Sequence, residues 1–202
     1  MSESAPSTEE KAGSNWFSRK TALFLGVAAL WIVVDQVSKK WIRDNLVLGR
    51  DRVPVIDGFF ELVHVENTGA AFGMLSDQWW AMWLFIPFTI LAALVLLSML
   101  RDVPANAIFE PLVLASIFGG ATGNFVDRVL AQGVTDFLRV YLDAPAFGGI
   151  EWPSFNVADI GIVIGVTLFI AHELFGSSGS RAGDSAGSPT ESSTQTEPSQ
   201  EA

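Results

Sequence analysis

Three aspartates, Asp127, Asp136 and Asp159, are the residues of this chain best suited to chemistry. Each lies close to the end of an apolar stretch, and a charged side chain beside lipid is costly enough to indicate a functional site. Two carboxylates held close together share one proton. The ionised member can then take a proton from water while the protonated member hydrogen-bonds a carbonyl. That chemistry cleaves a peptide bond without a metal or a covalent intermediate.

Other catalytic chemistries fit the composition less well. The chain has no cysteine, which excludes a thiol nucleophile, a disulfide framework and cysteine metal ligands. His172 and Glu173 begin like the zinc motif H-E-x-x-H, but Gly176 stands where the second histidine is needed. Ser38 and Lys39 are adjacent and do not face each other on a helix, which argues against a serine–lysine pair. We therefore expect no metal and no cofactor.

A structural role for the same acids is also compatible with the sequence. In that interpretation the three aspartates pair with Arg128 and Arg139 and cap helix ends. Asp35 and Lys39, which are four residues apart and would share a helix face, raise the same question. They either form a pair that ends a helix at the membrane interface or support a site. The residues alone leave both alternatives open.

The composition indicates a membrane protein. Half of the 202 residues are hydrophobic and only 17% are charged, whereas soluble domains usually carry about a quarter. Mean hydropathy is positive, at +0.37. About half of the formal net charge of −10 comes from the two ends of the chain, and no basic stripe is present. We therefore do not expect nucleic acid as a partner.

The elements that must position these acids are predicted to be four membrane-spanning helices. Each apolar segment has about the minimum length for a span, or more. The four segments are residues 21–37, 79–100, 105–126 and 157–175. Trp79, Trp80 and Trp83 suit an aromatic belt at the start of the second. Two glycine pairs at G-x-x-x-G spacing, Gly119 with Gly123 and Gly161 with Gly165, predict close helix packing.

Residues outside the spans divide into a β element, a short loop and two polar ends. Residues 50–66 predict a hairpin outside the membrane, with a turn at Asp57-Gly58 and an edge strand at Pro54. Thr135 and Asp136 are predicted to lie in a short loop. Residues 1–18 and 177–202 are rich in small and polar residues and are expected to be disordered. Basic residues flank the first span on both sides, so they do not decide its orientation.

Five blocks of sequence, in a fixed order, carry a resemblance to a known family. They are DQVSK at 35–39, NTGAAF at 67–72, GGATGNFVDR at 119–128, VTDF at 134–137 and FNVAD at 155–159. With four spans and an external β region, they resemble lipoprotein signal peptidase, also called signal peptidase II, over about residues 20–175. Each block is weak alone, but the combination is highly specific.

The resemblance implies a fold, an activity and a set of site residues. The fold would be a mainly α membrane protein with four spans and a small extracytoplasmic β element, in one peptidase domain at residues 19–176. The activity would be that of an aspartic endopeptidase. The catalytic pair falls on Asp136 and Asp159. Supporting or substrate-binding residues would be Asp35, Lys39, Asn67, Gly119, Asn124, Asp127, Arg128 and Asn156.

The resemblance also implies the substrate, the partners and the location. The substrate would be a bacterial prolipoprotein with a diacylglyceryl group on a cysteine, cleaved just before that cysteine. Membrane lipid would be the other partner, and the enzyme is expected to act as a monomer. Both termini would be cytoplasmic, in the cell inner membrane, with the site near the outer leaflet and the β element against the headgroups. The loop at residues 142–153 is interpreted as a tolerated insertion more readily than as a lid.

Two other functions are compatible with intramembrane acids. A proton-coupled transporter would show internal repeats and broken central helices, and we detect no repeat. A non-enzymatic scaffold would use the glycine spacings as helix contacts. Neither alternative accounts for the five ordered blocks.

Overall fold

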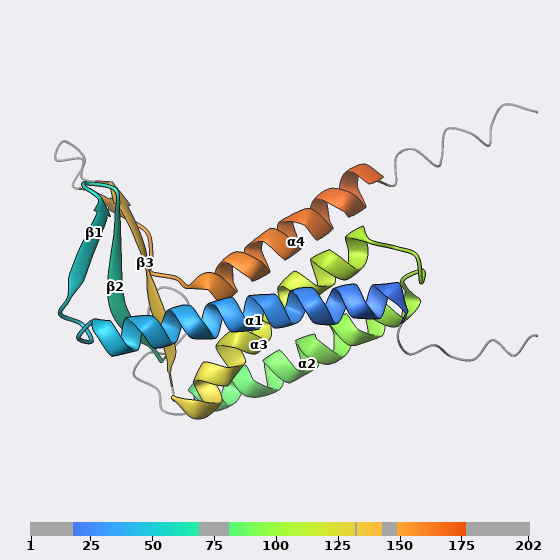
Figure 1. Cartoon of the computed structure of the whole chain (residues 1–202), viewed down its shortest axis with the longest axis horizontal. Helices are drawn as coiled ribbons and strands as arrows, with labels where there is room; N and C mark the ends of the chain where they lie inside the picture. The colour runs from blue at the N-terminus through green and yellow to red at the C-terminus, as the bar shows by residue number, and fades with distance from the viewer. Residues whose placement is uncertain (1–17, 69–80, 132, 143–148, 177–202) are drawn as a thin grey trace, which may run out of the picture. The chain divides into compact units, whose positions relative to one another are not determined.

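A computed structural model describes residues 18–68, 81–131, 133–142 and 149–176. It is mainly α-helical with one small antiparallel sheet (Figure 1). The chain divides into two compact units, residues 1–169 and 170–202, and every contact discussed below lies within the first. The elements in chain order are α1 (Arg19–Asn45), β1 (Arg52–Ile56), β2 (Phe60–Asn67), α2 (Ala81–Asp102), α3 (Phe109–Leu130), β3 (Val134–Leu142), β4 (Ile150–Glu151) and α4 (Val157–Gly176).

Within the described residues, three helices are long and apolar enough to cross a membrane: α1, residues 85–102 of α2 and residues 157–175 of α4. Helix α3 contains three charged residues, Glu110, Asp127 and Arg128, within its 22 residues. It begins at Phe109 instead of residue 105, because a turn closed by a hydrogen bond from Ala107 N to Pro104 O precedes it. Trp79 and Trp80 of the expected aromatic belt lie outside the described residues, as do residues 1–17 and 177–202 of the two polar ends, while Trp83 belongs to α2.

Helix α1 is longer than its sequence predicts. The sequence predicts that the apolar stretch ends at residue 37, with Asp35 and Lys39 either ending the helix at the interface or supporting a site, but the helix continues to Asn45. Asp35 and Lys39 are fully buried. The cap-pair interpretation is therefore wrong, because both side chains have partners inside the protein: Lys39 binds Asn124 and Asp127 of α3, and Asp35 accepts from the N–H of Ala158 of α4. Ser18 caps the start of α1 by accepting a hydrogen bond from Thr21 N at 3.4 Å.

Glycines bring α1, α3 and α4 close together. A Cβ on Gly119 of α3 would lie 2.8 Å from the Cβ of Trp31, and one on Gly161 of α4 would lie 3.2 Å from Ser116 O. One on Gly165 would lie 3.0 Å from Val113 O. The predicted close packing is confirmed at both glycine pairs. The order of these contacts makes α1 parallel to α3 and α4 antiparallel to both.

A lysine at the start of α1 binds the end of α2. Lys20 Nζ donates hydrogen bonds to Leu100 O at 2.9 Å and to Arg101 O at 3.0 Å, and it also contacts Val103 O. The last carbonyls of a helix have no partner within the helix, and a cation near them is favourable. Lys20 therefore stabilises the α1–α2 pair at the end of α1 far from Lys39.

The four strands form one antiparallel sheet in the order β1-β2-β3-β4. The predicted hairpin is confirmed: Gly58 adopts a φ of 75° in the turn, and Pro54 lies in the edge strand β1. The prediction that Thr135 and Asp136 lie in a loop is wrong, since both belong to β3, which pairs with β2. Neighbouring valines, Phe137 and Tyr141 favour a strand, but its partner is about 70 residues away in sequence.

The sheet is fixed against the end of α1. Phe137 packs with Ile42 and Leu46 in a small buried cluster. Leu138 of β3 forms an isolated bridge to Phe155, just before α4 begins. The strand with Asp136 and the first turn of α4 with Asp159 are therefore held at the same end of the helices.

Candidate active site

One asparagine contacts both aspartates of the predicted pair. Asn156 Nδ2 donates to Asp136 Oδ1 at 2.7 Å. The backbone N–H of Asn156 donates to Asp159 Oδ2 at 3.0 Å, and Asp159 N donates to Asn156 Oδ1 at 3.1 Å. Asn156 itself is fully buried. It therefore fixes the position of each carboxylate relative to the other.

The two bonds between Asn156 and Asp159 form a reciprocal N-terminal cap on α4. In such a capping box, the cap side chain accepts from the third helical residue, whose own side chain accepts from the cap backbone. Asp159 also lies in the first turn of α4. The positive end of the helix dipole favours a negative charge there. Local helix geometry thus accounts for the orientation of Asp159.

Asp136 is held by amides from two directions. Besides the bond from Asn156, Asp136 Oδ2 accepts from Asn67 Nδ2 at 3.0 Å. Asn67 is the last residue of β2, and Val65 of that strand is the register partner of Asp136. Asp136 is only 4% exposed. Burial, with a smaller contribution from the nearby Asp159 charge, raises the pKa of Asp136 to about 6, against the lowering effect of the hydrogen bonds from Asn67 and Asn156.

A buried lysine lies behind the pair. Lys39 Nζ is 2.8 Å from Asp35 Oδ2, 2.8 Å from Asp127 Oδ2 and 2.9 Å from Asn124 Oδ1. These three acceptors use all three donors of the ammonium group. A buried charge is tolerated only when it is paired and hydrogen-bonded in this way. Asp35 and Lys39 therefore form the pair expected from their spacing, with support from α3.

Asn124 connects this lysine to the pair. Its Oδ1 accepts from Lys39, so its Nδ2 faces Asp159 and donates to Oδ1 at 2.8 Å. Arg128, one turn later, donates from NH1 to Asn124 O at 3.1 Å and lies over the Phe85 ring. Arg128 also interacts electrostatically with Asp159, Asp136 and Asp127. Lys39 thus orients the amide that orients Asp159.

Asp127 has partners other than those of the predicted pair. It contacts Lys39 and lies 3.7 Å from Arg43. Its Oδ2 also accepts from Thr135 N at 3.4 Å. Arg139 forms its ion pairs with Glu61 and Glu151, so the structural interpretation in which the aspartates pair with Arg139 is wrong.

Most of the predicted site residues come together, with one exception. Asp35, Lys39, Asn67, Asn124, Asp127, Asp136, Asn156 and Asp159 form one hydrogen-bonded cluster, and Arg128 joins it through its bond to the Asn124 carbonyl. Gly119 is instead packed against Ala28 and Trp31. Gly123 is the glycine next to the cluster, since a Cβ there would lie 2.6 Å from Asp35 Oδ2.

Two participants were not identified from the sequence. Gln36 Nε2 lies 3.1 Å from Asp127 Oδ1 and 3.1 Å from Gly123 O. Arg43 NH1 donates to Thr135 Oγ1 at 3.0 Å. Arg43 lies four residues after Lys39, which is one helical turn, and this spacing was the available signal.

Charges within the cluster nearly balance. Four carboxylates (Asp35, Asp127, Asp136 and Asp159) face three cations (Lys39, Arg43 and Arg128). One proton on the carboxylates makes the cluster neutral. Within the described residues, no group of three acidic or histidine side chains could hold a metal ion. Every buried side-chain nitrogen or oxygen there has a hydrogen-bond partner.

Known proteins resemble this chain over most of its length. The family model described as Signal peptidase (SPase) II matches residues 27–175. Lipoprotein signal peptidase of Nitratidesulfovibrio vulgaris (strain DP4) is 43% identical over 157 residues, covering 76% of this chain and 91% of the relative. That of Janthinobacterium sp. (strain Marseille) is 39% identical over 166 residues, covering 81% and 96%.

A solved structure extends the likeness to three dimensions. A bacterial membrane enzyme determined at 2.3 Å resolution matches with a TM-score of 0.68 and 34% identity, over 79% of this chain and 92% of that one. The matched family region contains all four aspartates of the cluster. By sequence and by fold, this chain belongs to the signal peptidase II family of proteases.

Proposed function

We propose that this protease removes the signal peptide from diacylglyceryl-modified prolipoproteins by an aspartic mechanism, cleaving just before the lipid-bearing cysteine. The observation that supports this most strongly is the double contact of Asn156 with Asp136 and Asp159. It holds two carboxylates at one end of a bundle of apolar helices. A lipid-anchored peptide reaches such a position with its acyl chains still in the bilayer.

In the proposed reaction, the two carboxylates have different roles. Asp159, at the positive end of α4, is ionised and takes a proton from the attacking water. Asp136 retains its proton and donates a hydrogen bond to the scissile carbonyl. The water oxygen bonds to the carbonyl carbon, and the C–N bond then breaks. A proton passes from the pair to the departing amine of the cysteine, which leaves a free carboxylate on the signal peptide.

The remaining residues of the cluster position this pair. Asn67, Asn124 and Asn156 orient the carboxylates without adding charge. Lys39 and Asp35 hold Asn124 and the start of α4, and Asp127 and Arg128 complete the charge balance. We assign catalysis to Asp136 and Asp159 and a supporting role to the others.

The proposed topology has four spans, with α3 as the fourth alongside the three more apolar helices. Both termini would be cytoplasmic, and the site would lie near the outer leaflet of the inner membrane, in a monomer. The sheet would rest on the headgroups, where Phe59 is about half exposed. Replacing Phe59 and Phe60 with Asp is expected to weaken that contact. Unchanged lipid protection together with unchanged activity would remove this part of the proposal.

The proposed function is tested by cleavage of a diacylglyceryl-modified prolipoprotein by purified enzyme in detergent. Asp136→Asn and Asp159→Asn are expected to abolish cleavage, whereas Asp127→Asn retains a measurable part. Thermal unfolding of each variant checks that it remains folded. Loss of cleavage only in Asp127→Asn and Asp159→Asn would reassign the pair. Full activity in all three would exclude the aspartic mechanism.

A further inference from the structure

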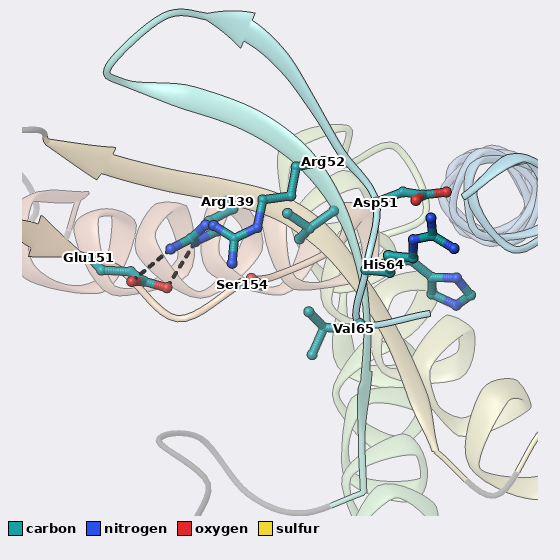
Figure 2. Close-up of a pocket in the computed structure, with 10 residues that line it drawn as sticks. Asp51, Arg52, His64, Val65, Arg139, Glu151 and Ser154 are labelled. Carbon is teal, nitrogen blue, oxygen red and sulfur yellow. Dashed lines mark hydrogen bonds and ion pairs between the residues drawn. The ribbon is translucent and has the colours of Figure 1, made fainter. Parts of the chain in front are cut away.

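A small pocket lies on the sheet, lined by residues that do not belong to the aspartate cluster. It has a volume of about 130 Å³. It is lined by Gly49, Arg50, Asp51, Arg52, Val63, His64, Val65, Arg139, Glu151 and Ser154 (Figure 2). Arg139 and Asp136 are three apart on β3, so their side chains leave opposite faces of the strand. The proposed reaction uses none of these residues.

The cations of this pocket differ in how far they are already paired. Arg139 makes two bonds to Glu151, both at 2.8 Å, and also contacts Glu61. Its donors are therefore used within the protein, and it lines the pocket without being available to a ligand. Arg52 lies 3.5 Å from the same Glu61 and interacts electrostatically with Glu151, but its side chain is 62% exposed. Within the described ranges, Arg50 has no ion-pair partner. Arg50 and Arg52 therefore retain donors for a ligand.

His64 adds a further polar group. Its Nδ1 lies 2.8 Å from Leu46 O. A carbonyl only accepts, so Nδ1 carries the hydrogen and the ring orientation is fixed. Asp51 is occupied as an acceptor for Val47 N at 2.8 Å. The acids of the pocket are thus engaged by donors of the protein, while two arginines remain available.

The position of the pocket indicates which kind of anion would bind there. Arg50 follows the end of the apolar helix α1 by only five residues. Val47, Leu48, Val53 and Val55, which flank the two arginines along the chain, are each about half exposed. Exposed apolar side chains on both sides of arginines, at the end of a spanning helix, suit the headgroup layer of a membrane. The anion at that depth is a lipid phosphodiester, and the guanidinium group matches phosphate geometry.

We propose that the pocket lined by Arg50 and Arg52 binds the phosphodiester group of an anionic phospholipid. This rests on the proposed function in that the sheet lies at the membrane surface. The volume of about 130 Å³ has room for a phosphate group. Binding there would hold the sheet, and with it β3, at a fixed depth relative to the bilayer.

The test compares phosphatidylglycerol binding by wild type and Arg50→Gln/Arg52→Gln. Native mass spectrometry of enzyme from nanodiscs of phosphatidylglycerol and phosphatidylcholine counts the retained lipids. Removal of two cations near the surface is expected to weaken phosphatidylglycerol retention about 10- to 30-fold. Arg19→Gln/Lys40→Gln, which removes two exposed cations elsewhere on α1, is expected to retain the lipid like wild type. Equal retention in wild type and Arg50→Gln/Arg52→Gln overturns the proposal.

Three more measurements distinguish an anionic lipid from a free anion and from the substrate polypeptide. Arg50→Lys/Arg52→Lys keeps both charges but not the guanidinium groups, so it is expected to retain less lipid than wild type and more than the Gln variant, while equal loss in the Lys and Gln variants overturns the proposal. Binding of inorganic phosphate without retention of phosphatidylglycerol assigns the pocket to a free anion and overturns it. Weaker cleavage with unchanged lipid retention assigns it to the substrate polypeptide and also overturns it. Lipid counting does not depend on cleavage, so failure of the aspartic mechanism would be seen separately.

Discussion

The carboxylate of Asp35 accepts a hydrogen bond from the backbone N–H of Ala158 at 2.9 Å. Asp35 belongs to α1 and Ala158 is the second residue of α4, so a side chain of the first helix caps the start of the last one. Asp159 is the next residue. The position of a proposed catalytic carboxylate therefore depends on a residue 124 positions earlier in the chain.

Gly123→Ala tests this dependence. The new Cβ would lie 2.6 Å from Asp35 Oδ2, so Asp35 must move away from Ala158. We expect cleavage to fall at least about 10-fold, because small misplacements of a catalytic group are costly. Gly26→Ala, on α1 with nothing within 4 Å of the new Cβ, is the matched control and should cleave like wild type. Equal activity of the two variants would refute the role of Asp35.

Lys39→Met is expected to destabilise the protein by about 3–5 kcal/mol, because it leaves Asp35 and Asp127 as buried carboxylates without their shared cation. Adding Asp127→Asn removes one of those charges and should restore part of the loss, which a double-mutant cycle measures by thermal unfolding in detergent. Lys40→Met removes the adjacent, exposed lysine and should change stability by less than about 1 kcal/mol. Additive effects of Lys39→Met and Asp127→Asn would contradict the assigned coupling.

Two substitutions of Asn156 separate its cap from its contact with Asp136. Asn156→Ala removes both and should lower stability by about 1 kcal/mol as well as abolish most cleavage. Asn156→Asp keeps a good cap residue, but it adds a buried carboxylate beside Asp136, so stability should be retained only when that group is protonated. We expect little cleavage at pH 7 and partial recovery at pH 5, when the added group can be protonated. Wild-type cleavage by Asn156→Asp at pH 7 would argue against the amide donor being needed.

The raised pKa of Asp136 predicts a pH dependence of stability. Folding raises this pKa from 3.8 to about 6, so the folded state binds the proton more tightly. The resulting stabilisation is complete below about pH 4 and is lost as pH rises through about 6. Asp136→Asn cannot lose a proton. From pH 4 to pH 7 the variant should therefore gain stability relative to wild type, by up to about 3 kcal/mol at 1.36 kcal/mol per pKa unit.

Thermal unfolding of both proteins across this pH range measures the gain. Asp44→Asn, at an exposed position on α1, is the control and should follow the wild-type curve. Parallel curves for wild type and Asp136→Asn would mean that Asp136 is not shifted in the folded protein.

The predictability of this fold depended on which interactions were local. The apolar runs and the Asp57-Gly58 turn are local signals, and the helices and hairpin were predicted from them. The end of α1 was not, because two of the three partners of Lys39, Asn124 and Asp127, lie 85 and 88 residues away on α3. Asp35 and Lys39 interrupt the apolar run in the sequence, but they are buried inside the folded protein.

Strand β3 was missed for a related reason. Thr135 and Asp136 were predicted to lie in a short loop between two apolar segments. Their strand conformation depends on β2, and the register shifts between Leu62 and Val65. Leu62 pairs with Leu138 and Val65 pairs with Asp136. The two β2 residues are three positions apart but their partners on β3 are only two apart, so β2 does not keep a regular alternation of side chains between the two faces. The site residues were recognised from blocks of sequence, whereas Gln36 and Arg43 became evident only from side-chain contacts.

The bonds from Lys20 to the end of α2 have a consequence for biosynthesis. All of their atoms belong to the first 103 residues, so this contact can close while α3 and α4 are still being made. The first two helices can therefore enter the bilayer as a pair of helices joined by these hydrogen bonds, and α3 and α4 then pack onto this pair. A Lys20→Met chain should then show its defect as slow or incomplete insertion in pulse–chase experiments, ahead of any change in cleavage by the molecules that mature.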